Sequence, residues 1–155
     1  MHKGRLSAAS HLPDHVLVLV EGVNRRMHRE LLEAGDPPHP RGGFMRLLQM
    51  IPERGIRITD LAALSGMTKQ SLGEFVNAME EDGLVVSEKL PSDRRVRVVV
   101  RTADGERVAR EVSARIAAVE QAWRKEAGPE RYDTMKAVLY DLGMESFGTR
   151  TEPEA

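Results

Sequence analysis

The stretch from residue 58 to residue 85 constrains the fold most, because it contains two short helical patterns joined by a three-residue turn. It reads ITDLAALSGMTKQSLGEFVNAMEEDGLV, with the turn at residues 65 to 67. Thr59 can cap the first helix and Thr68 the second, since a threonine hydroxyl accepts hydrogen bonds from the first backbone N–H groups of a helix. Two helices joined by a short glycine-containing turn indicate a helix-turn-helix.

The second of these helices is expected to have one apolar face and one polar face. The apolar side chains, which must face a core, are Leu72, Phe75, Val76 and Met79. The polar face and the amino end carry Lys69, Gln70, Ser71, Gly73, Glu74 and Asn77. Such a helix can lie in the major groove of DNA, where Gln or Asn pairs with adenine through two hydrogen bonds. The alternative is that this polar face is ordinary solvated surface.

A basic β-hairpin is predicted directly after the helix-turn-helix. Two β-prone runs, residues 84–89 and 95–101, flank a turn at residues 90–94. Residues 88 to 101 hold five basic and two acidic side chains, a local charge of +3 in a chain whose net charge is −1. The basic residues are Lys89, Arg94, Arg95, Arg97 and Arg101, and the alternating apolar residues of the second run are Val96, Val98 and Val100. A basic two-stranded wing suits DNA phosphates and a narrow minor groove, whose negative potential attracts arginine.

Four further helices are expected around this segment. The first runs from Pro13, in its first turn, to near Gly35, and the second covers about residues 44 to 51. The third is capped by Thr102 and runs for about 25 residues, or roughly 37 Å. The fourth covers about residues 130 to 142. The stripe of the third helix is Val108, Val112, Ile116, Val119 and Trp123.

These long helices near the two chain ends predict a dimerisation surface. Each has an apolar stripe that the small winged core cannot cover, and the simplest partner is a second copy of the chain. The residues expected to complement the stripe of the third helix are Val16, Val23, Met27, Leu31, Val138, Leu139 and Leu142.

The wing sequence SDRRVRVVVRTADG resembles the wing signature of the MarR (multiple-antibiotic-resistance regulator) family of winged-helix transcription regulators. In that family an Asp two residues before an Arg precedes a strand that ends in Leu-Thr and leads into a helix. Asp93, Arg95 and Thr102 match this signature, while Arg101 stands where Leu is usual. The resemblance follows the element order over nearly the whole chain and is sharpest over residues 58 to 105.

The resemblance implies roles for particular residues. Arg95 or its neighbour Arg94 would enter the minor groove, with Asp93 bracing the arginine. The candidate DNA-contacting residues are Thr68, Lys69, Gln70, Ser71, Glu74, Asn77, Lys89, Arg94, Arg95 and Arg97. Regulators of this family commonly bind a small aromatic or anionic effector between the dimerisation helices and the winged domain. The candidate side chains for such a site are His15, His39, Arg46 and Trp123.

The sequence therefore predicts a mostly α-helical protein with a small β-hairpin wing, a winged helix-turn-helix with long N- and C-terminal dimerisation helices. One regulator domain is expected over residues 13–147. Within it we expect a DNA-binding part (44–101) and dimerisation helices (13–35 and 102–147), with flexible tails at 1–12 and 148–155.

Composition disfavours several classes of protein. The chain has no cysteine, which excludes a disulfide, a thiolate zinc site and a cysteine nucleophile. The longest aliphatic run, residues 16 to 20, is too short for a membrane span, and we expect a cytoplasmic protein. No nucleophile with a base beside it, glycine-rich phosphate loop or acidic metal cluster is found, so no enzyme, cofactor or metal is expected.

The expected function is a homodimeric transcription regulator, a repressor relieved by a ligand, that binds double-stranded DNA at a pseudo-palindromic operator. Its half-sites would lie roughly 34 to 36 Å apart. Two alternatives stay open. One is a winged-helix module that binds another protein through the acidic helix end at residues 80–82 and through the long helices. The other is a zinc-responsive regulator that uses the histidines His2, His11, His15, His28 and His39, of which His11 and His15 have i, i+4 spacing.

Overall fold

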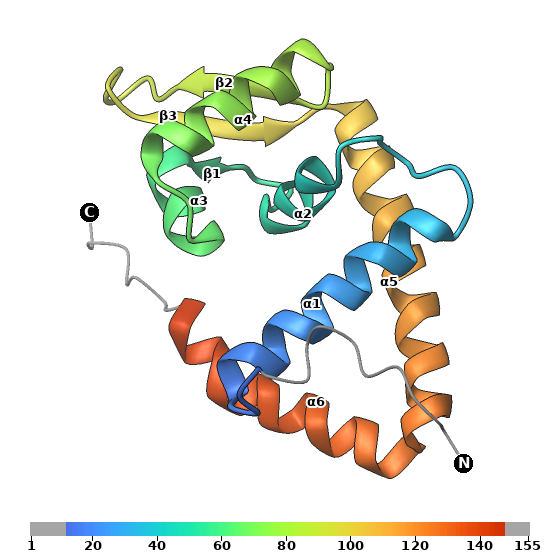
Figure 1. Ribbon diagram of the computed structural model, residues 1–155. Helices are drawn as coiled ribbons and strands as arrows, with labels where there is room; N and C mark the ends of the chain where they lie inside the picture. The colour runs from blue at the N-terminus through green and yellow to red at the C-terminus, as the bar shows by residue number, and fades with distance from the viewer. Residues whose placement is uncertain (1–11, 148–155) are drawn as a thin grey trace.

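The computed structural model describes residues 12–147 and places a small winged unit above a frame of longer helices (Figure 1). In chain order the elements are α1 (Val16–Glu33), α2 (Gly42–Met50), β1 (Ile56–Arg57), α3 (Ile58–Ser65), α4 (Lys69–Glu81), β2 (Val85–Lys89), β3 (Arg97–Arg101), α5 (Ala103–Ala127), α6 (Pro129–Gly143) and the 3₁₀ helix η1 (Met144–Phe147). We call residues 42–101 the winged head. Below it, α1, α5 and α6 outline a triangle, and α5 runs from the sheet down one side (Figure 1). The expected class, mostly helical with a winged helix-turn-helix, is confirmed.

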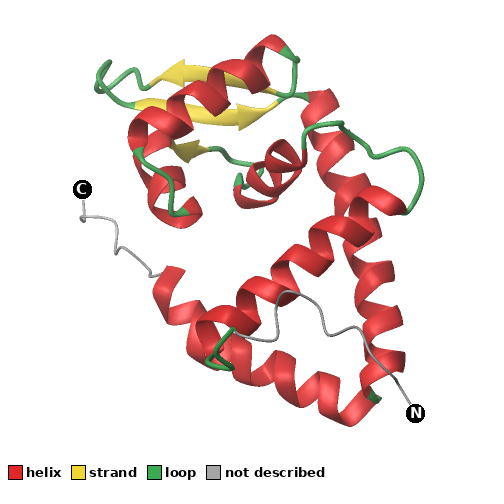
Figure 2. Ribbon diagram, viewed as in Figure 1, coloured by secondary structure: helices red, strands yellow, loops and turns green. Residues whose placement is uncertain are grey.

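The sheet has three antiparallel strands in the order β1-β3-β2 (Figure 2). The hairpin of β2 and β3 agrees with the sequence, and its register pairs Val85 with Arg101 and Lys89 with Arg97. Strand β1, in which Ile56 pairs with Val99, was not predicted from the sequence. Two residues are too few to show a strand periodicity, so only the pairing with β3 reveals this strand.

The two faces of β3 differ in what they contact. Val99 is fully buried in the core of the winged head, and Arg97 and Arg101 share its face because strand side chains alternate. The alternating valines lie on the opposite face, where Val98 and Val100 are only partly buried. Gly55 packs beside them with φ +82, and a Cβ there would lie 2.8 Å from Val100 Cγ2. Glycine is therefore required at this close approach.

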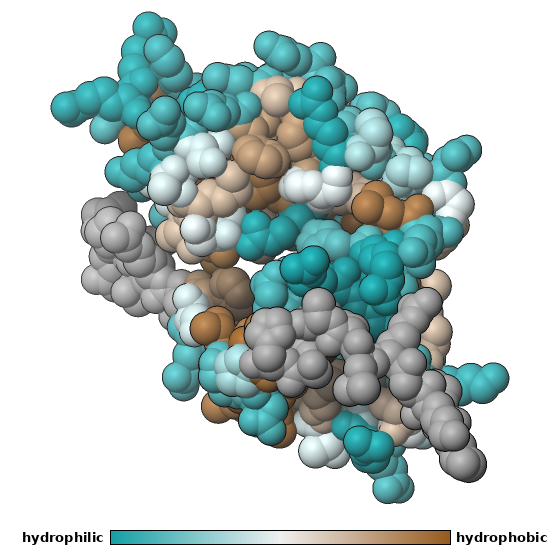
Figure 3. Space-filling view, viewed as in Figure 1, coloured by the Kyte–Doolittle hydropathy of each residue, from teal (hydrophilic) through white to brown (hydrophobic). Residues whose placement is uncertain are grey.

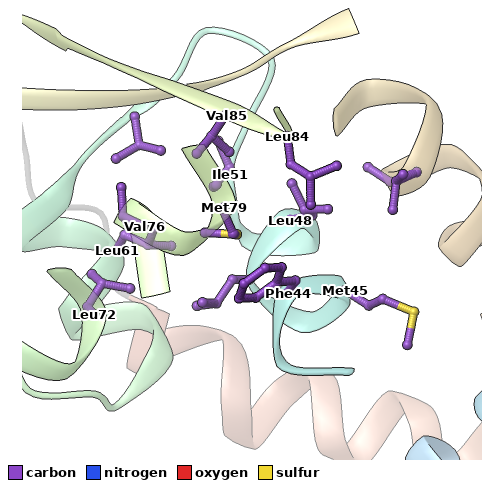
Figure 4. Close-up of a cluster of buried hydrophobic side chains, with 14 of the residues drawn as sticks. Phe44, Met45, Leu48, Ile51, Leu61, Leu72, Val76, Met79, Leu84 and Val85 are labelled. Carbon is purple, nitrogen blue, oxygen red and sulfur yellow. The ribbon is translucent and has the colours of Figure 1, made fainter. Parts of the chain in front are cut away.

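The core of the winged head is built from α2, α3, α4 and the sheet, and the amino-terminal part of α5 packs into it (Figure 4). Leu72, Val76 and Met79 are fully buried, as the sequence predicts, and Phe75 packs against the core while partly exposed. The largest other buried side chains are Phe44, Leu47, Leu48, Ile51, Leu61, Leu84, Val85, Val99 and Val108. This packing fixes the orientation of α4 and leaves its polar face outside.

A polar contact fixes the winged head to α5. The Gln49 amide Nε2 donates a hydrogen bond of 2.9 Å to the Ala109 carbonyl, and the Ser113 hydroxyl donates one of 2.9 Å to Gln49 Oε1. Because both atoms of this amide contact α5, a movement of that helix would be transmitted directly to α2.

The apolar stripe of α5 is covered by the same chain, which corrects the expected role of that stripe in a dimer. Val108 and Val112 belong to the core of the winged head. Val119 and Trp123 pack with Leu31 of α1 and Tyr132 of α6 in a second core. The sequence did not reveal these partners because they lie far from α5 along the chain.

Exposed apolar side chains are concentrated on the amino-terminal part of α1 and on α6 and η1 instead. They are Val16, Leu17, Leu19, Val20, Val23, Met135, Val138, Leu139, Tyr140, Leu142, Met144 and Phe147. Of the residues expected to complement α5, Leu31 is buried and Met27 partly buried against it within the chain. We call the twelve exposed residues named above the apolar frame surface. Hydrophobic residues are visible at the lower left of the space-filling view, in the region of α1 and α6 (Figure 3).

Several expected helix starts are confirmed and two are wrong. Thr68 and Thr102 cap α4 and α5 by accepting hydrogen bonds from the N–H groups of Ser71 and Gly105. Thr59 does not cap α3, because β1 runs directly into that helix and leaves Arg57 at the N-cap position. Pro13 is not in the first turn of α1, which begins at Val16 after the N-cap residue His15. No packing from the described part of the chain supports an earlier turn there, since residues 12–17 are exposed.

Across residues 12–147, no helix is long and apolar enough to cross a membrane. His2 and His11, and both expected tails apart from Leu12, lie outside the described residues.

Candidate nucleic-acid interface

Helix α4 presents a polar face whose amino end is fixed by the turn before it. Gly66 has φ 69, a left-handed conformation that glycine adopts without strain, and it ends α3. Two residues later the Thr68 hydroxyl accepts a hydrogen bond of 3.1 Å from the Ser71 N–H. The chain therefore enters α4 at a defined angle, with its first turn on the outside of the winged head.

The predicted outward residues of α4 are largely where the sequence placed them. Lys69, Gln70, Glu74 and Asn77 are exposed, while Ser71 and Gly73 are half-buried. Within residues 12–147 the side chains of Gln70 and Glu74 make no hydrogen bond, so the Gln70 amide offers both its donor and its acceptor to a partner.

The tip of the hairpin, residues 89–96, carries three exposed cations, Lys89, Arg94 and Arg95. Asp93 Oδ1 accepts hydrogen bonds from the Arg95 backbone N–H at 3.0 Å and from Arg95 Nε at 3.4 Å. Asp93 thus contacts the Arg95 backbone and the Nε side of the guanidinium. The arginine side chain stays 94% exposed. The wing tip is among the hydrophilic regions at the upper left of the space-filling view (Figure 3).

Two of the five basic residues counted in the wing are used inside the winged head. Arg97 Nη2 donates hydrogen bonds to Asn77 Oδ1 at 3.2 Å and to Glu80 Oε2 at 3.1 Å. Arg101 Nη1 donates to the Leu48 carbonyl at 3.1 Å, and its side chain is only 14% exposed. The sequence predicted both as wing cations because it could not show that this face of β3 packs on the helices.

The acidic end of α4 is also partly paired within the chain. Glu80 forms an ion pair with Arg97, and Asp82 Oδ2 lies 3.1 Å from Nε2 of His39. This pairing reduces the acidic surface through which the alternative, a protein-binding module, would contact its partner.

A capped helix with an outward polar row lies beside a hairpin with a basic tip, and comparisons with known proteins agree with this arrangement. A family model described as the MarR family matches residues 45–96, which include α3, α4, β2 and the wing tip. Over these residues the chain is similar to the MarR family. The resemblance seen in the wing sequence is thereby confirmed.

One curated relative is the HTH-type transcriptional regulator PetP of Rhodobacter capsulatus. It is 33% identical over 87 residues, which make up 56% of this chain and 52% of PetP. The match thus spans about half the length of that relative.

Solved structures of MarR regulators share the fold over most of the chain. A MarR family regulator from Rhodococcus sp. RHA1 has a TM-score of 0.71 and 22% identity, covering 90% of this chain and 99% of its own. CouR from Rhodococcus jostii RHA1, bound to p-coumaroyl-CoA, has a TM-score of 0.68 and 21% identity, covering 90% and 96%. The repressor CouR bound to a 23-mer DNA duplex has a TM-score of 0.69 and 20% identity, covering 88% and 97%. At these identities the likeness concerns the fold.

The four candidate effector residues lie in separate surroundings. His39 stacks on Phe44 with ring centroids 5.1 Å apart, and Arg46 donates to the Ser65 carbonyl at 2.9 Å. Trp123 is buried in the second core, and His15 is exposed at the start of α1. The structure does not bring these side chains together into one site.

Two surface hollows lie elsewhere. One, between α1 and α5, is lined by Glu30, Glu33, Ala34, Ala114, Arg115, Ala118, Val119 and Ala122. The other is lined by Arg41, Gly43, Phe44, Glu74, Phe75 and Ala78. None of the four candidate residues lines either of them. Among the described residues, no group of three or more His, Asp or Glu side chains could hold a metal ion.

The contact between Glu80 and Arg97 was not predicted from the sequence. Glu80 was interpreted as part of an acidic helix end, whereas it lies one helical turn from Asn77 and faces the hairpin. The i, i+3 spacing of Asn77 and Glu80 is a sequence signal for a shared face, but the arginine that meets it comes from a strand 17 residues beyond Glu80.

Proposed function

We propose that this protein is a sequence-specific DNA-binding regulator of transcription rather than an enzyme, and that it acts in the cytoplasm. The observation that carries the proposal is the capped helix α4, whose outward polar side chains lie beside a hairpin tip with three exposed cations. The amino-terminal part of such a helix reads base edges in the major groove, and arginines beside it bind phosphates or the narrow minor groove. The match to the MarR family model over residues 45–96 and the DNA-bound structure of CouR support this proposal.

The proposed roles of the contact residues follow from their exposure. Gln70 and Asn77 read bases, whereas Thr68, Lys69, Ser71 and Glu74 lie around the amino end and outer face of α4, next to the DNA. In the wing, Lys89, Arg94 and Arg95 contact phosphates or the minor groove, and Asp93 holds Arg95. Arg97 differs from these wing residues because its guanidinium is hydrogen-bonded to Asn77 and Glu80 of α4. In this assignment the expected DNA-binding part, residues 44–101, acts as one unit.

We propose that the protein acts as a homodimer formed through the apolar frame surface. Leu17 is 78% exposed and Leu142 is 74% exposed, and burying such a side chain contributes roughly 1.5 to 3 kcal/mol. A two-fold dimer would present two α4 helices to successive major grooves, roughly 34 to 36 Å apart, on a pseudo-palindromic operator. In this arrangement α1 and α6 carry the dimer interface, and α5 supports them through the second core.

Regulation is proposed to be repression that a small aromatic or anionic compound relieves. CouR is a repressor with a structure bound to p-coumaroyl-CoA, which supports an effector of that general kind here. A compound that binds better to a dimer with misplaced winged heads would shift the population away from the DNA-bound form. The hydrogen bonds of Gln49 to α5 supply a route from the helical frame to α2.

The experiment that tests the proposal is selection of bound sequences from a random pool of double-stranded DNA. We expect enrichment of a two-fold symmetric site and an affinity that falls steeply as salt rises, since phosphate contacts release counterions. A matched control is the double variant Arg94→Ala, Arg95→Ala, which removes two exposed cations without touching a core. If the parent enriches no sequence and its binding does not depend on salt, the proposal is wrong.

A further inference from the structure

Resting on the proposed function, we propose that Arg97 and Glu80 are positioning residues that set which base Asn77 reads. The three side chains form a contact between β3 and α4 that we call the Arg97 clamp. The clamp takes one lone pair of the Asn77 amide oxygen and turns that oxygen towards Arg97, which leaves the Nδ2 donor for DNA. The base that Asn77 reads in each half-site is then guanine rather than adenine.

The geometry of the clamp fixes the orientation of the amide. Arg97 Nη2 lies 3.2 Å from Asn77 Oδ1 and 3.1 Å from Glu80 Oε2. A guanidinium group has only donors, so the amide atom that faces it must be the oxygen. The Nδ2 group of Asn77 is the other end of the same exposed amide and keeps its two N–H donors.

The position of Arg97 follows from the register of the hairpin. Arg97 pairs with Lys89 at the end of the sheet and shares the face of Val99, which is buried against the helices. Its side chain is 33% exposed, compared with 94% for Arg95 at the tip. Arg97 is therefore directed to α4, whereas Arg95 is available to a phosphate.

Glu80 supplies the charge that keeps Arg97 in place. A hydrogen bond between a guanidinium and a carboxylate is stronger than one to a neutral amide. Asn77 and Glu80 are one helical turn apart, so a single guanidinium nitrogen reaches both. Without the carboxylate, the arginine would be free to leave Asn77.

The chemistry of the base edges gives the expected preference. Guanine presents two acceptors, N7 and O6, in the major groove, while adenine presents the acceptor N7 and a donor amine. An amide that offers both atoms to the base matches adenine, whereas one whose oxygen is turned towards Arg97 presents only its N–H donors, which suit the two acceptors of guanine. Gln70 is the internal contrast, because its amide makes no hydrogen bond in the described part of the chain and suits adenine.

The test is selection from a random DNA pool with the full-length protein and three variants. Arg97→Met removes the guanidinium and keeps the apolar stem, Glu80→Ala removes the carboxylate, and Asn77→Ala removes the reader. We expect Arg97→Met and Glu80→Ala to shift one position of each half-site from guanine towards adenine by about tenfold. Asn77→Ala should erase the preference at that same position. Circular dichroism verifies that each variant is folded.

Other results would overturn the clamp. If Arg97→Met lowers affinity for all sequences and reduces the salt slope by about 1, Arg97 is a phosphate contact. If the parent selects adenine at the position that Asn77→Ala affects, the assigned orientation is wrong. A parent that enriches a site while neither Arg97→Met nor Glu80→Ala changes it refutes the clamp alone. A parent that enriches nothing refutes the DNA-binding proposal as well.

Discussion

The indole Nε1 of Trp123 donates a hydrogen bond of 2.7 Å to Glu30 Oε2, and this bond joins α5 to α1. Arg26 takes part in the same network, since it donates to Glu30 at 2.6 Å and lies 5.0 Å above the indole ring. Hydrogen bonds from Arg26 and Trp123 hold the pKa of Glu30 below its ordinary value. The network thus stabilises the pairing of α5 with α1, one of the helices that carry the apolar frame surface.

Trp123→Phe should destabilise this helix pairing. The variant loses a hydrogen bond to a charged group, worth about 1.5 to 3 kcal/mol, while most of the apolar contact remains. We expect the free energy of unfolding to fall by that amount in urea titrations. Trp123 is the only tryptophan of the chain, so circular dichroism must replace fluorescence.

A matched control separates the hydrogen bond from packing. Glu30→Gln keeps an acceptor for the indole but removes the charge that attracts Arg26. It should cost less than Trp123→Phe. Equal stability of parent and Trp123→Phe would show that this hydrogen bond contributes nothing.

Arg95→Ala should weaken DNA binding for nearly all sequences alike. The side chain is 94% exposed, so its loss should leave the free energy of unfolding unchanged. Removal of one phosphate contact reduces the slope of log affinity against log salt by about 1. Fluorescence anisotropy with a labelled duplex at several salt concentrations measures this slope, and an unchanged slope would exclude Arg95 from the interface.

Gln70→Ala should change base preference instead. Its free amide is suited to a two-bond contact with adenine, and loss of that contact costs about 1 to 3 kcal/mol at one position of each half-site. Selection from a random pool should show relaxed preference there and an unchanged salt slope. Identical selected sites for parent and variant would contradict the assigned outward face of α4.

Tyr132 should make the fold sensitive to alkaline pH. Burial, together with a hydrogen bond to Glu120, raises the pKa of Tyr132 from 10.0 to about 12. Because the folded pKa is the higher one, the neutral phenol stabilises the folded state fully below pH 10, and this contribution is lost as pH rises through 12. Tyr132→Phe should therefore lose less stability than the parent between these pH values. Parallel stability curves for the two proteins would refute this contribution.

The sequence predicts features that depend on near neighbours. Thr68 and Thr102 act as caps because a cap involves residues three positions apart, and the core face of α4 follows from helical spacing alone. The long-range features were missed. Strand β1 exists only through its pairing with β3, and Arg97 was counted as a wing cation because nothing local indicates that it meets Glu80.

The stripe of α5 illustrates the same limit for the dimer. Periodicity correctly placed Val119 and Trp123 on one face, but it could not show that Leu31 and Tyr132 cover them within the chain. Burial depends on which elements meet in space. Five of the residues that the sequence assigned to the dimer do remain exposed, but they lie on α1 and α6 and do not cover the stripe of α5: Val16, Val23, Val138, Leu139 and Leu142.

Charge introduced into the apolar frame surface should separate the proposed dimer. Leu17 and Leu142 are 78% and 74% exposed in one chain, so Leu17→Asp and Leu142→Asp place a charge in solvent and should leave the fold intact. In a dimer the same carboxylate would be buried without a partner, which costs several kcal/mol and favours the monomer. Light scattering at micromolar protein should give twice the chain mass for the parent and a reduced mass for the variants. Leu31→Asp is the contrasting variant, because Leu31 is buried within the chain and its replacement should unfold the protein. A monomeric parent would refute the dimer, and dimeric, folded variants would show that the interface lies elsewhere.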